Sequence, residues 1–347
     1  MKTSNRPAYA DFDTEAKFLA IEGIIARRLK QYPKAMCAYS GGSDSDLLLD
    51  LIERVRRIYN LAPVQYVFYN TGLEMEATIR HVKEQAATYG VSIEMIRPKI
   101  GIVHAVHKCG QPFYSKKFSC AMERAQRHNV PLSISEEYQK AVDKEAKYAE
   151  LKQRYPKAVA PINFICGCDK DGKPVRNGQL SLPANQSLYA FMLENPIPFS
   201  ISAKCCDYCK KQPAHQYEKQ YDMVITGERA AEGGLRALNI HSNGTPCFFS
   251  TKEGVQRLRP IFYVTNADKA WYKSYYNLRY SDAYEVYGFK RTGCCGCPIS
   301  AKAVEEMERL KPFEPNLYKA VWNVFGEAYR YRQEYEKFKR RNEIGEV

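Results

Sequence analysis

The sequence lacks a long apolar run. Within its 347 residues no stretch approaches the roughly 18 consecutive apolar residues that a membrane-spanning helix needs. No apolar segment follows Met1 and Lys2, as it would in a secretory signal. We therefore expect a cytoplasmic protein without a membrane segment.

Acidic residues are scarce relative to basic ones. The chain has 39 Asp and Glu against 52 Lys and Arg, which makes the formal net charge +13. This balance favours a polyanionic partner, either a nucleotide or a nucleic acid, although a basic surface that is merely solvated stays open. The length allows two domains or one elaborated α/β domain, and the oligomeric state is open.

The missing secretory signal affects the interpretation of the twelve cysteines. The cytosol keeps thiols reduced, so clustered cysteines indicate metal binding or catalysis rather than disulfides. Two clusters stand out, KCCDYCKK at 204–211 and RTGCCGCP at 291–298. Four thiolates can hold a structural zinc ion or a 4Fe-4S cluster, and the residues alone leave both open, beside a set of buried structural thiols.

Apolar segments of two kinds alternate in the first hundred residues. Short apolar runs predict strands at 35–39, 64–69 and 91–96, and stripes at helical spacing predict helices at 14–31, 45–59 and 74–89. A further short strand is predicted at 223–226. This alternation predicts an α/β fold with a doubly wound parallel sheet, whose ligands bind beyond the carboxyl ends of the strands.

A polar loop lies at one of those ends. It consists of Ser40, Gly41, Gly42, Ser43, Asp44 and Ser45. Glycines let an anion approach the backbone, and the following helix directs its N–H groups and positive dipole at the same place; we expect Ser43 or Asp44 to cap that helix. No Lys closes the loop, which excludes the Walker type. The loop predicts a phosphate site.

This loop resembles the S-G-G-x-D-S signature of the N-type ATP pyrophosphatases, the PP-loop superfamily. The segment FYNTGLEMEAT at 68–78 resembles the D-T-G-x-x-x-x-E-T segment of phosphoadenosine phosphosulfate (PAPS) reductases, with Asn70 in place of Asp. A third segment resembles the family's G-x-R-x-x-E-[SG]-x-x-R through Gly227, Arg229, Glu232 and Arg236. The resemblance implies an adenine nucleotide alpha hydrolase-like, Rossmann-like fold, with Thr71, Gly72 and this third set as nucleotide contacts.

Two arginines at this spacing can face one phosphate or sulfate, since guanidinium groups bind such oxyanions bidentately. In the alternative, Arg229 and Glu232 form a surface ion pair three residues apart. The segment YGFKRTGCCGCP resembles Y-G-x-x-R-T-G-C-x-x-C-P of the same family, which adds Lys290 and Arg291 as anion ligands.

The cysteines follow one another as a Cys-Cys pair, a long interval and then Cys-x-x-Cys. This order resembles the pattern with which assimilatory adenylyl-sulfate reductases hold a 4Fe-4S cluster. Carried over, it implies four ligands, Cys205, Cys206, Cys294 and Cys297. Cys209 is the main rival ligand, because it forms a second Cys-x-x-Cys with Cys206.

No cysteine follows Cys297, whereas those reductases use a nucleophilic Cys in a C-terminal Glu-Cys-Gly segment. Together with the intact loop at 40–45, the missing cysteine favours an enzyme that cleaves Mg²⁺-ATP to AMP and pyrophosphate and supports sulfur transfer. We expect a nucleic acid as the acceptor and a sulfur-donor protein as a further partner.

Two other functions stay open. One is a PAPS or adenylyl-sulfate reductase whose nucleophile is Cys120, Cys166, Cys168 or Cys209; of these, Cys120 and Cys209 have basic neighbours in sequence. The other is a non-catalytic, nucleotide-sensing iron–sulfur regulator. Arg229, Arg236, Cys120 and Cys209 are thus the catalytic candidates.

The segments divide the chain into four parts. We expect a nucleotide-binding core in two pieces, 1–114 and 204–300, separated by a charged, turn-rich helical insertion at 115–203 and followed by a C-terminal helical segment at 301–347.

Overall fold

The three strands predicted near the start of the chain pair as one parallel sheet. In the computed structural model, which describes residues 7–175, 181–233, 236 and 247–344, they are β1 (Ala35–Ala38), β2 (Gln65–Tyr69) and β3 (Ile93–Ile96). Met36 lies opposite Gln65, and Tyr66 lies opposite Ile93. All three strand predictions are confirmed to within two residues.

The predicted strand at 223–226 is β4 (Met223–Thr226), which pairs in parallel with β1 on the side away from β2. Beside it lie β6 (Gln256–Leu258), also parallel, and β5 (Phe248–Ser250), which is antiparallel at the edge. The order is β3-β2-β1-β4-β6-β5. The sequence analysis missed β5 and β6, because three residues are too few to show a period. The chain changes direction between β1 and β4, and ligands bind at such a switch point.

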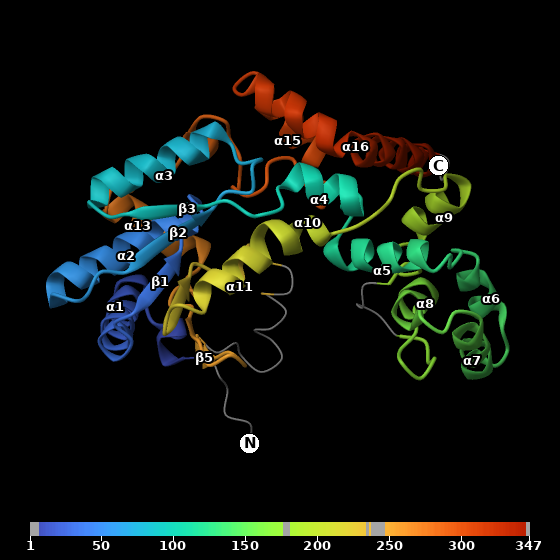
Figure 1. Ribbon diagram of the computed structural model, residues 1–347, viewed down its shortest axis with the longest axis horizontal. Coiled ribbons are helices and arrows are strands. Elements are labelled where there is room, and N and C mark those ends of the chain that lie inside the picture. Colours follow the sequence, from blue (N-terminus) through green and yellow to red (C-terminus); the bar gives the residue numbers. More distant parts are fainter. Residues whose placement is uncertain (1–6, 176–180, 234–235, 237–246, 345–347) are drawn as a thin grey trace. The chain divides into compact units, whose positions relative to one another are not determined.

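Helices cover both faces of this sheet, which confirms the doubly wound α/β fold (Figure 1). Cys37 and alternate strand residues pack in one apolar cluster with side chains of four helices: α1 (Thr14–Gln31), α2 (Ser43–Tyr59), α3 (Glu76–Tyr89) and α13 (Asn266–Tyr275). On the opposite face Met36 packs with Val67 and Val224 near Tyr217 of α11 (Gln212–Glu218). A sheet buried on both faces needs apolar residues at consecutive positions, which explains the continuous apolar runs.

A buried ion pair joins the first helix of the chain to a helix some 250 residues later. Lys17 Nζ of α1 lies 2.7 Å from Asp268 Oδ2 of α13, and Thr14 Oγ1 donates to Asp268 Oδ1 at 2.7 Å. Burial alone would raise the pKa of Asp268, but hydrogen bonds from Lys17, Thr14 and Thr265 outweigh it and lower the pKa to about 2. The charged carboxylate therefore stabilises the fold above about pH 4, and this contribution is lost as the pH falls toward 2.

The chain divides into two compact units. The first, Met1–Lys99 with Cys209–Cys295, contains the sheet; the second is Ile100–Tyr208 with Gly296–Val347. In the second unit α16 (Pro315–Ile344) packs against α4 (Ile102–Cys109) and α9 (Gln186–Glu194). The segments predicted as an insertion and as a separate C-terminal part thus share one unit, whose core includes Phe113, Phe191 and Tyr331.

The other elements are short or lie at the surface of their unit. In the second unit they are α5 (Lys116–Arg127), α6 (Ile134–Lys140), α7 (Lys144–Arg154), α8 (Val159–Cys166), α10 (Lys204–Cys206) and α15 (Ala303–Leu310). In the rest of the described chain they are η1 (Ala8–Asp11), η2 (Asp207–Lys211), η3 (Ala230–Glu232) and α14 (Asp282–Glu285).

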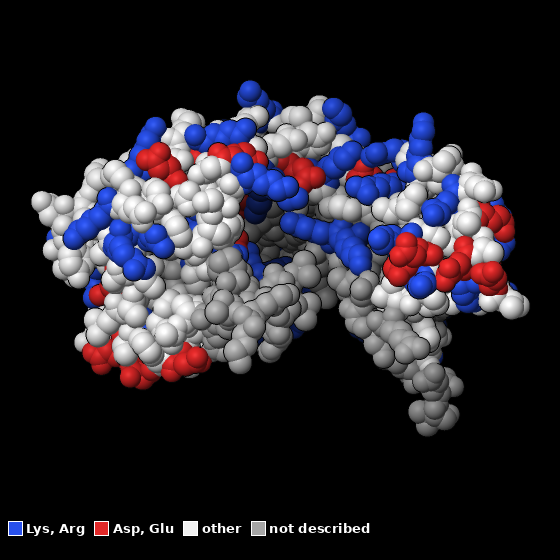
Figure 2. All heavy atoms as spheres, turned by 90° about the horizontal axis from the view of Figure 1, so that it is seen from below, with Lys and Arg blue, Asp and Glu red and all other residues white. Residues whose placement is uncertain are grey.

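Basic side chains are spread over the face shown in Figure 2, whereas acidic ones gather in a few groups. Among the described residues, no helix combines the length and the apolarity needed to cross a membrane.

Replacing Lys17 with Met should lower the free energy of unfolding by about 3 kcal/mol at pH 7, because Asp268 then stays buried without its cation. Urea unfolding measures this loss. Lys30→Met on the exposed surface of the same helix is the control and should change stability by less than about 0.5 kcal/mol. An equal loss in both variants would contradict the role of the pair.

Candidate functional site

The polar loop at 40–45 connects β1 to α2, and its own side chains hold it closed. Gly42 is the N-cap of α2, so the prediction that Ser43 or Asp44 caps this helix is wrong. Ser45 Oγ accepts from the N–H groups of Gly42 at 3.0 Å and Ser40 at 3.3 Å, and donates to the Gly42 carbonyl at 2.7 Å. One hydroxyl thus fixes the turn from inside, while the first residues of α2 follow it directly.

The two glycines are required by close packing. Gly41 has a φ of 65°, and a Cβ there would lie 2.9 Å from side-chain carbons of Thr78 and Val82 on α3. A Cβ on Gly42 would lie 2.8 Å from Thr292 Oγ1 and 3.1 Å from the Tyr284 hydroxyl. The sequence analysis expected glycines here only because they let an anion approach the backbone. The structure adds that neighbouring elements leave no room for a side chain at either position.

Two cations meet on Asp44 at the start of α2. Arg229 Nε lies 2.8 Å and Lys269 Nζ lies 2.5 Å from Asp44 Oδ1. Lys269 Nζ also donates to Ser43 Oγ at 2.5 Å. Burial lowers the pKa of Lys269, and the Asp44 carboxylate opposes that shift.

Arg229 is buried, with 4% of its surface exposed. Besides Asp44, its guanidinium donates to the Val264 carbonyl at 2.9 Å and to Asn266 Oδ1 at 3.1 Å. Sequence reasoning missed Lys269 altogether, since it lies in an ordinary helix far from the loop in the chain. No local motif marks it, and only the fold supplies the lysine that the loop lacks.

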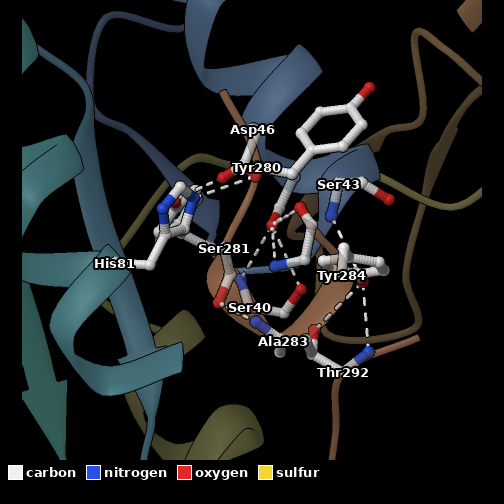
Figure 3. Close-up of polar contacts among 12 residues, drawn as sticks. Ser40, Ser43, Asp46, His81, Tyr280, Ser281, Ala283, Tyr284 and Thr292 are labelled. Carbon is white, nitrogen blue, oxygen red and sulfur yellow. Dashed lines mark hydrogen bonds and ion pairs between the residues drawn. The ribbon is translucent and has the colours of Figure 1, made fainter. Parts of the chain in front are cut away.

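Behind the loop lies a buried carboxylate with its partners, shown in Figure 3. Asp46 Oδ2 lies 3.0 Å from His81 Nε2, and Asp46 Oδ1 accepts from the Tyr39 hydroxyl at 2.5 Å. Asp46 and His81 are each 3% exposed. Burial, with the neighbouring Asp46, raises the pKa of Tyr39 well above its ordinary value. These contacts tie α2 to α3 and to the end of β1.

The segment 280–292 lies over the same loop (Figure 3). The Tyr284 hydroxyl accepts from the N–H of Ser43 at 3.3 Å and from the N–H of Thr292 at 3.1 Å. Lys290 and Arg291, predicted as anion ligands, are exposed and immediately precede Thr292. The Tyr284 hydroxyl thus accepts a hydrogen bond from one of the N–H groups at the start of α2.

The second predicted segment forms a turn after β2. Thr71 Oγ1 donates to Glu74 Oε1 at 2.9 Å, and Gly72 N donates to Asn70 Oδ1 at 2.9 Å. An Asn side chain makes this turn as well as an Asp would, which accounts for the departure at position 70. Cys294 Sγ lies 3.6 Å from Thr71 Oγ1, so the fold brings this turn to the second cysteine cluster.

The third predicted segment follows β4. Gly227 approaches the loop closely, since a Cβ there would lie 3.2 Å from the Asp44 carbonyl oxygen. Arg236 pairs with Glu232 and lies 3.8 Å from Glu228. The alternative that Arg229 pairs with Glu232 is wrong, because Arg229 turns to Asp44 instead.

Residues 34–158 match the family model described as the phosphoadenosine phosphosulfate reductase domain. The match covers less than half of the chain. The match begins at β1 and includes the 40–45 loop and the turn at 70–74, and it leaves out the third segment and both cysteine clusters. No curated protein matches the chain.

Solved structures similar to the chain include a PAPS reductase from Candida auris in its phosphate complex, at 15% identity and a TM-score of 0.39, covering 79% of this chain and 87% of that one. The NH3-dependent NAD synthetase of Campylobacter jejuni has 11% identity and a TM-score of 0.34, with coverage of 92% and 96%. The U34-tRNA thiolase NcsA of Methanococcus maripaludis, with its [4Fe-4S] cluster, has 10% identity and a TM-score of 0.35, with coverage of 93% and 80%.

The cysteines predicted from the resemblance to the PAPS reductase family fall in both units. Cys294 belongs to the first unit, and Cys205, Cys206 and Cys297 belong to the second. Within the described ranges, no group of three or more His, Cys, Asp or Glu side chains is placed to hold a metal ion. The ligand set therefore stays a prediction.

The two candidate nucleophiles differ in accessibility. Cys120 is exposed on α5, and Lys116 and Lys117 lie in the first turn of the same helix. Cys209 is 1% exposed. A nucleophilic thiol must reach its substrate, so the structure favours Cys120 over Cys209 as a candidate.

Replacing Gly41 with Ala should lower the free energy of unfolding by about 2 kcal/mol or more, because the new methyl group meets Thr78 and Val82 in addition to the strain of a positive φ. Gly90→Ala is the matched control, since Gly90 has the same φ of 65° and nothing within 4 Å of its Cβ position. Thermal unfolding compares them. A loss in Gly41→Ala no larger than in Gly90→Ala would show that the packing around Gly41 yields freely.

Proposed function

We propose that this chain is a cytoplasmic ATP pyrophosphatase of the PAPS reductase family that adenylates a nucleic acid and supports its thiolation. One observation carries this proposal: Arg229 and Lys269 converge on Asp44 at the start of α2, directly after a glycine-rich loop. This arrangement is chemically suited to a polyphosphate. Such a group needs backbone N–H groups, a helix dipole and cations at one place.

The loop and its cations have separate tasks. The positive end of the α2 dipole would attract the pyrophosphate portion of ATP, and the N–H of Ser43 would exchange the Tyr284 hydroxyl for a phosphate oxygen. Asp44 would hold the Mg²⁺ that bridges the phosphates. Lys269 contacts both Ser43 and Asp44, so a small rotation of its long side chain would bring its charge to a phosphate. Arg229 is fixed by Val264 and Asn266 and would keep Asp44 in place.

The proposed reaction has two steps. An oxygen of the acceptor attacks the α-phosphorus of ATP, the bond to the bridging oxygen breaks, and pyrophosphate leaves with Mg²⁺. The acceptor oxygen now carries AMP. A hydrosulfide ion released by a donor protein attacks the acceptor carbon that bears this oxygen, the C–O bond breaks, and AMP leaves with the oxygen while sulfur takes its place. The loop and Lys269 would stabilise the charge that develops on the leaving pyrophosphate. The net charge of +13 supports a nucleic acid as acceptor.

The remaining predicted residues keep their assignments within this proposal. Thr71 and Gly72 would contact the nucleotide from the turn after β2, and Gly227, Arg236, Lys290 and Arg291 would contribute anion contacts. Glu232 would orient Arg236 through their ion pair. Cys205, Cys206, Cys294 and Cys297 would hold a 4Fe-4S cluster, since four thiolates are its usual ligands. When bound, such a cluster supplies iron that coordinates sulfur.

With Mg²⁺-ATP and RNA or DNA as acceptor, replacing Lys269 with Met should lower the rate of pyrophosphate release about a hundredfold, because one cation at the leaving group is lost. A coupled phosphate assay measures the release. Lys273→Met, on the same helix and paired with Glu285 at 2.9 Å, is the control and should keep its rate. Equal rates in both variants would contradict the assignment of Lys269, and the absence of release from the parent protein would sink the proposed activity.

The reductase alternative predicts a different product. Sulfite release from PAPS or adenylyl sulfate with thioredoxin as reductant should be undetectable in this protein. Robust sulfite production that Cys120→Ser abolishes would replace the proposal with a reductase.

Replacing Cys294 or Cys297 with Ser should lower the iron content of protein purified without oxygen to a small fraction of that of the parent, since metal and ligand thiolates bind as a set. Iron analysis and the visible absorption spectrum measure this. Cys120→Ser is the control and should retain iron. Full iron content in Cys294→Ser and Cys297→Ser would exclude both thiols as ligands.

A further inference from the structure

The second unit contains a groove that none of the residues discussed above explains. Its volume is about 560 Å³, and its walls come from α4, from residues 110–111 and 199–200, and from the middle of α16. All of these segments belong to the second unit. The groove is therefore separate from the 40–45 loop.

One wall of the groove is a stripe along α16. Trp322, Gly326 and Arg330 follow at intervals of four residues and so lie on one side of the helix. A Cβ on Gly326 would lie 3.3 Å from Arg330 Nη1, so the guanidinium folds back over the glycine. The guanidinium thus occupies the space that the missing side chain leaves, one helical turn, roughly 5.4 Å, from the level of the indole. The helix therefore presents an aromatic ring with a cation about one turn away.

The indole has a fixed support. Tyr329 packs edge-on against Trp322, with ring centroids 4.9 Å apart and an interplanar angle of 70°. Trp322 is half-buried and lines the groove. The ring is therefore held from the helix side while the groove gives access to it.

The opposite wall is fixed by hydrogen bonds. The N–H of Gln111 donates to the Ser200 carbonyl at 2.9 Å. The buried Gln111 side chain donates to Glu327 Oε2 at 2.8 Å and accepts from the N–H of Ala328 at 2.9 Å. This amide joins the wall to α16 and holds the Glu327 carboxylate at the groove. A ligand therefore meets an anchored hydrogen-bond acceptor as well as the cation.

We propose that this groove binds one nucleotide of a single-stranded nucleic acid. The base would stack on Trp322, the phosphate would contact Arg330, and an amino group of the base could donate to Glu327. Stacking of bases on aromatic rings with nearby basic groups is the general mode of single-strand binding. The assignment deepens the proposed function by giving its acceptor a binding site, although ATP binding at the first unit does not depend on it.

The chain offers a direct reporter, because Trp271 and Trp322 are its two tryptophans. In a Trp271→Phe background, the emission of Trp322 is recorded while single-stranded oligo(dA), oligo(rA), a DNA duplex or AMP is added. We expect the single strands to quench the emission, with an affinity that falls as salt rises. AMP and the duplex should bind at least tenfold more weakly. Equal affinity for AMP would overturn the assignment to a strand.

Two variants in this background locate the effect. Gly326→Leu places a side chain that favours helix where the Arg330 guanidinium lies, and Arg330→Gln removes the cation; each should lower the affinity for single strands at least tenfold. Arg340→Gln, an exposed residue of the same helix, is the control. Circular dichroism verifies that each variant is folded. Absence of quenching, or quenching that Gly326→Leu and Arg330→Gln leave unchanged, would overturn the proposal.

Calorimetric binding of ATP to the same variants separates the two proposals. Gly326→Leu and Arg330→Gln should bind ATP as the parent does. Loss of strand binding with intact ATP binding supports the groove. Strand quenching in a parent protein that neither binds nor cleaves ATP would refute the proposed function and leave the groove in place.

Discussion

The organisation of the first unit depends on the placement of Asp44 between two cations. Arg229 and Lys269 come from segments far from the loop in sequence, and both end on the same carboxylate oxygen. A carboxylate at a helix N-terminus is favoured by the helix dipole, and the two cations add to that attraction. Arg229 also binds the 264–266 segment through Val264 and Asn266, so this one carboxylate links α2, β4 and the start of α13.

Close packing around the loop at 40–45 also fixes the loop against its neighbours. The Cβ positions of Gly41, Gly42 and Gly227 are all crowded by other elements, so the loop cannot spread without moving α3 or the 280–292 segment. Asp46, with His81 and Tyr39, closes the space behind it. The neighbouring elements therefore hold the backbone of this loop in one shape.

The two units use their polar groups differently. In the first, charged side chains converge on a helix start, where they can act on a polyphosphate. In the second, Trp322 and Arg330 combine an aromatic ring with a single cation, an arrangement suited to a flat group that carries one phosphate.

Local patterns in the sequence were enough for the strands β1 to β4, for helices α1 to α3, and for the glycine-rich loop, because these features depend on residues that are neighbours in the chain. They were not enough for β5 and β6, whose three residues each are held by pairing alone. The N-cap of α2 was misassigned, because Ser43 or Asp44 could also cap a helix that starts here. In the structure Gly42 is the N-cap, and the Ser45 hydroxyl bonds to its N–H and carbonyl groups.

The sequence by itself thus determined the α/β class and the position of the glycine-rich loop between a strand and a helix. Only the tertiary structure decided which side chains reach that loop. Lys269 and Tyr284 lie in helices without any motif, and they arrive at Ser43 because α13 and α14 pack beside α2 and α3. Residues more than two hundred positions apart become neighbours through packing of apolar faces, and no local spacing records which polar side chains that packing brings together.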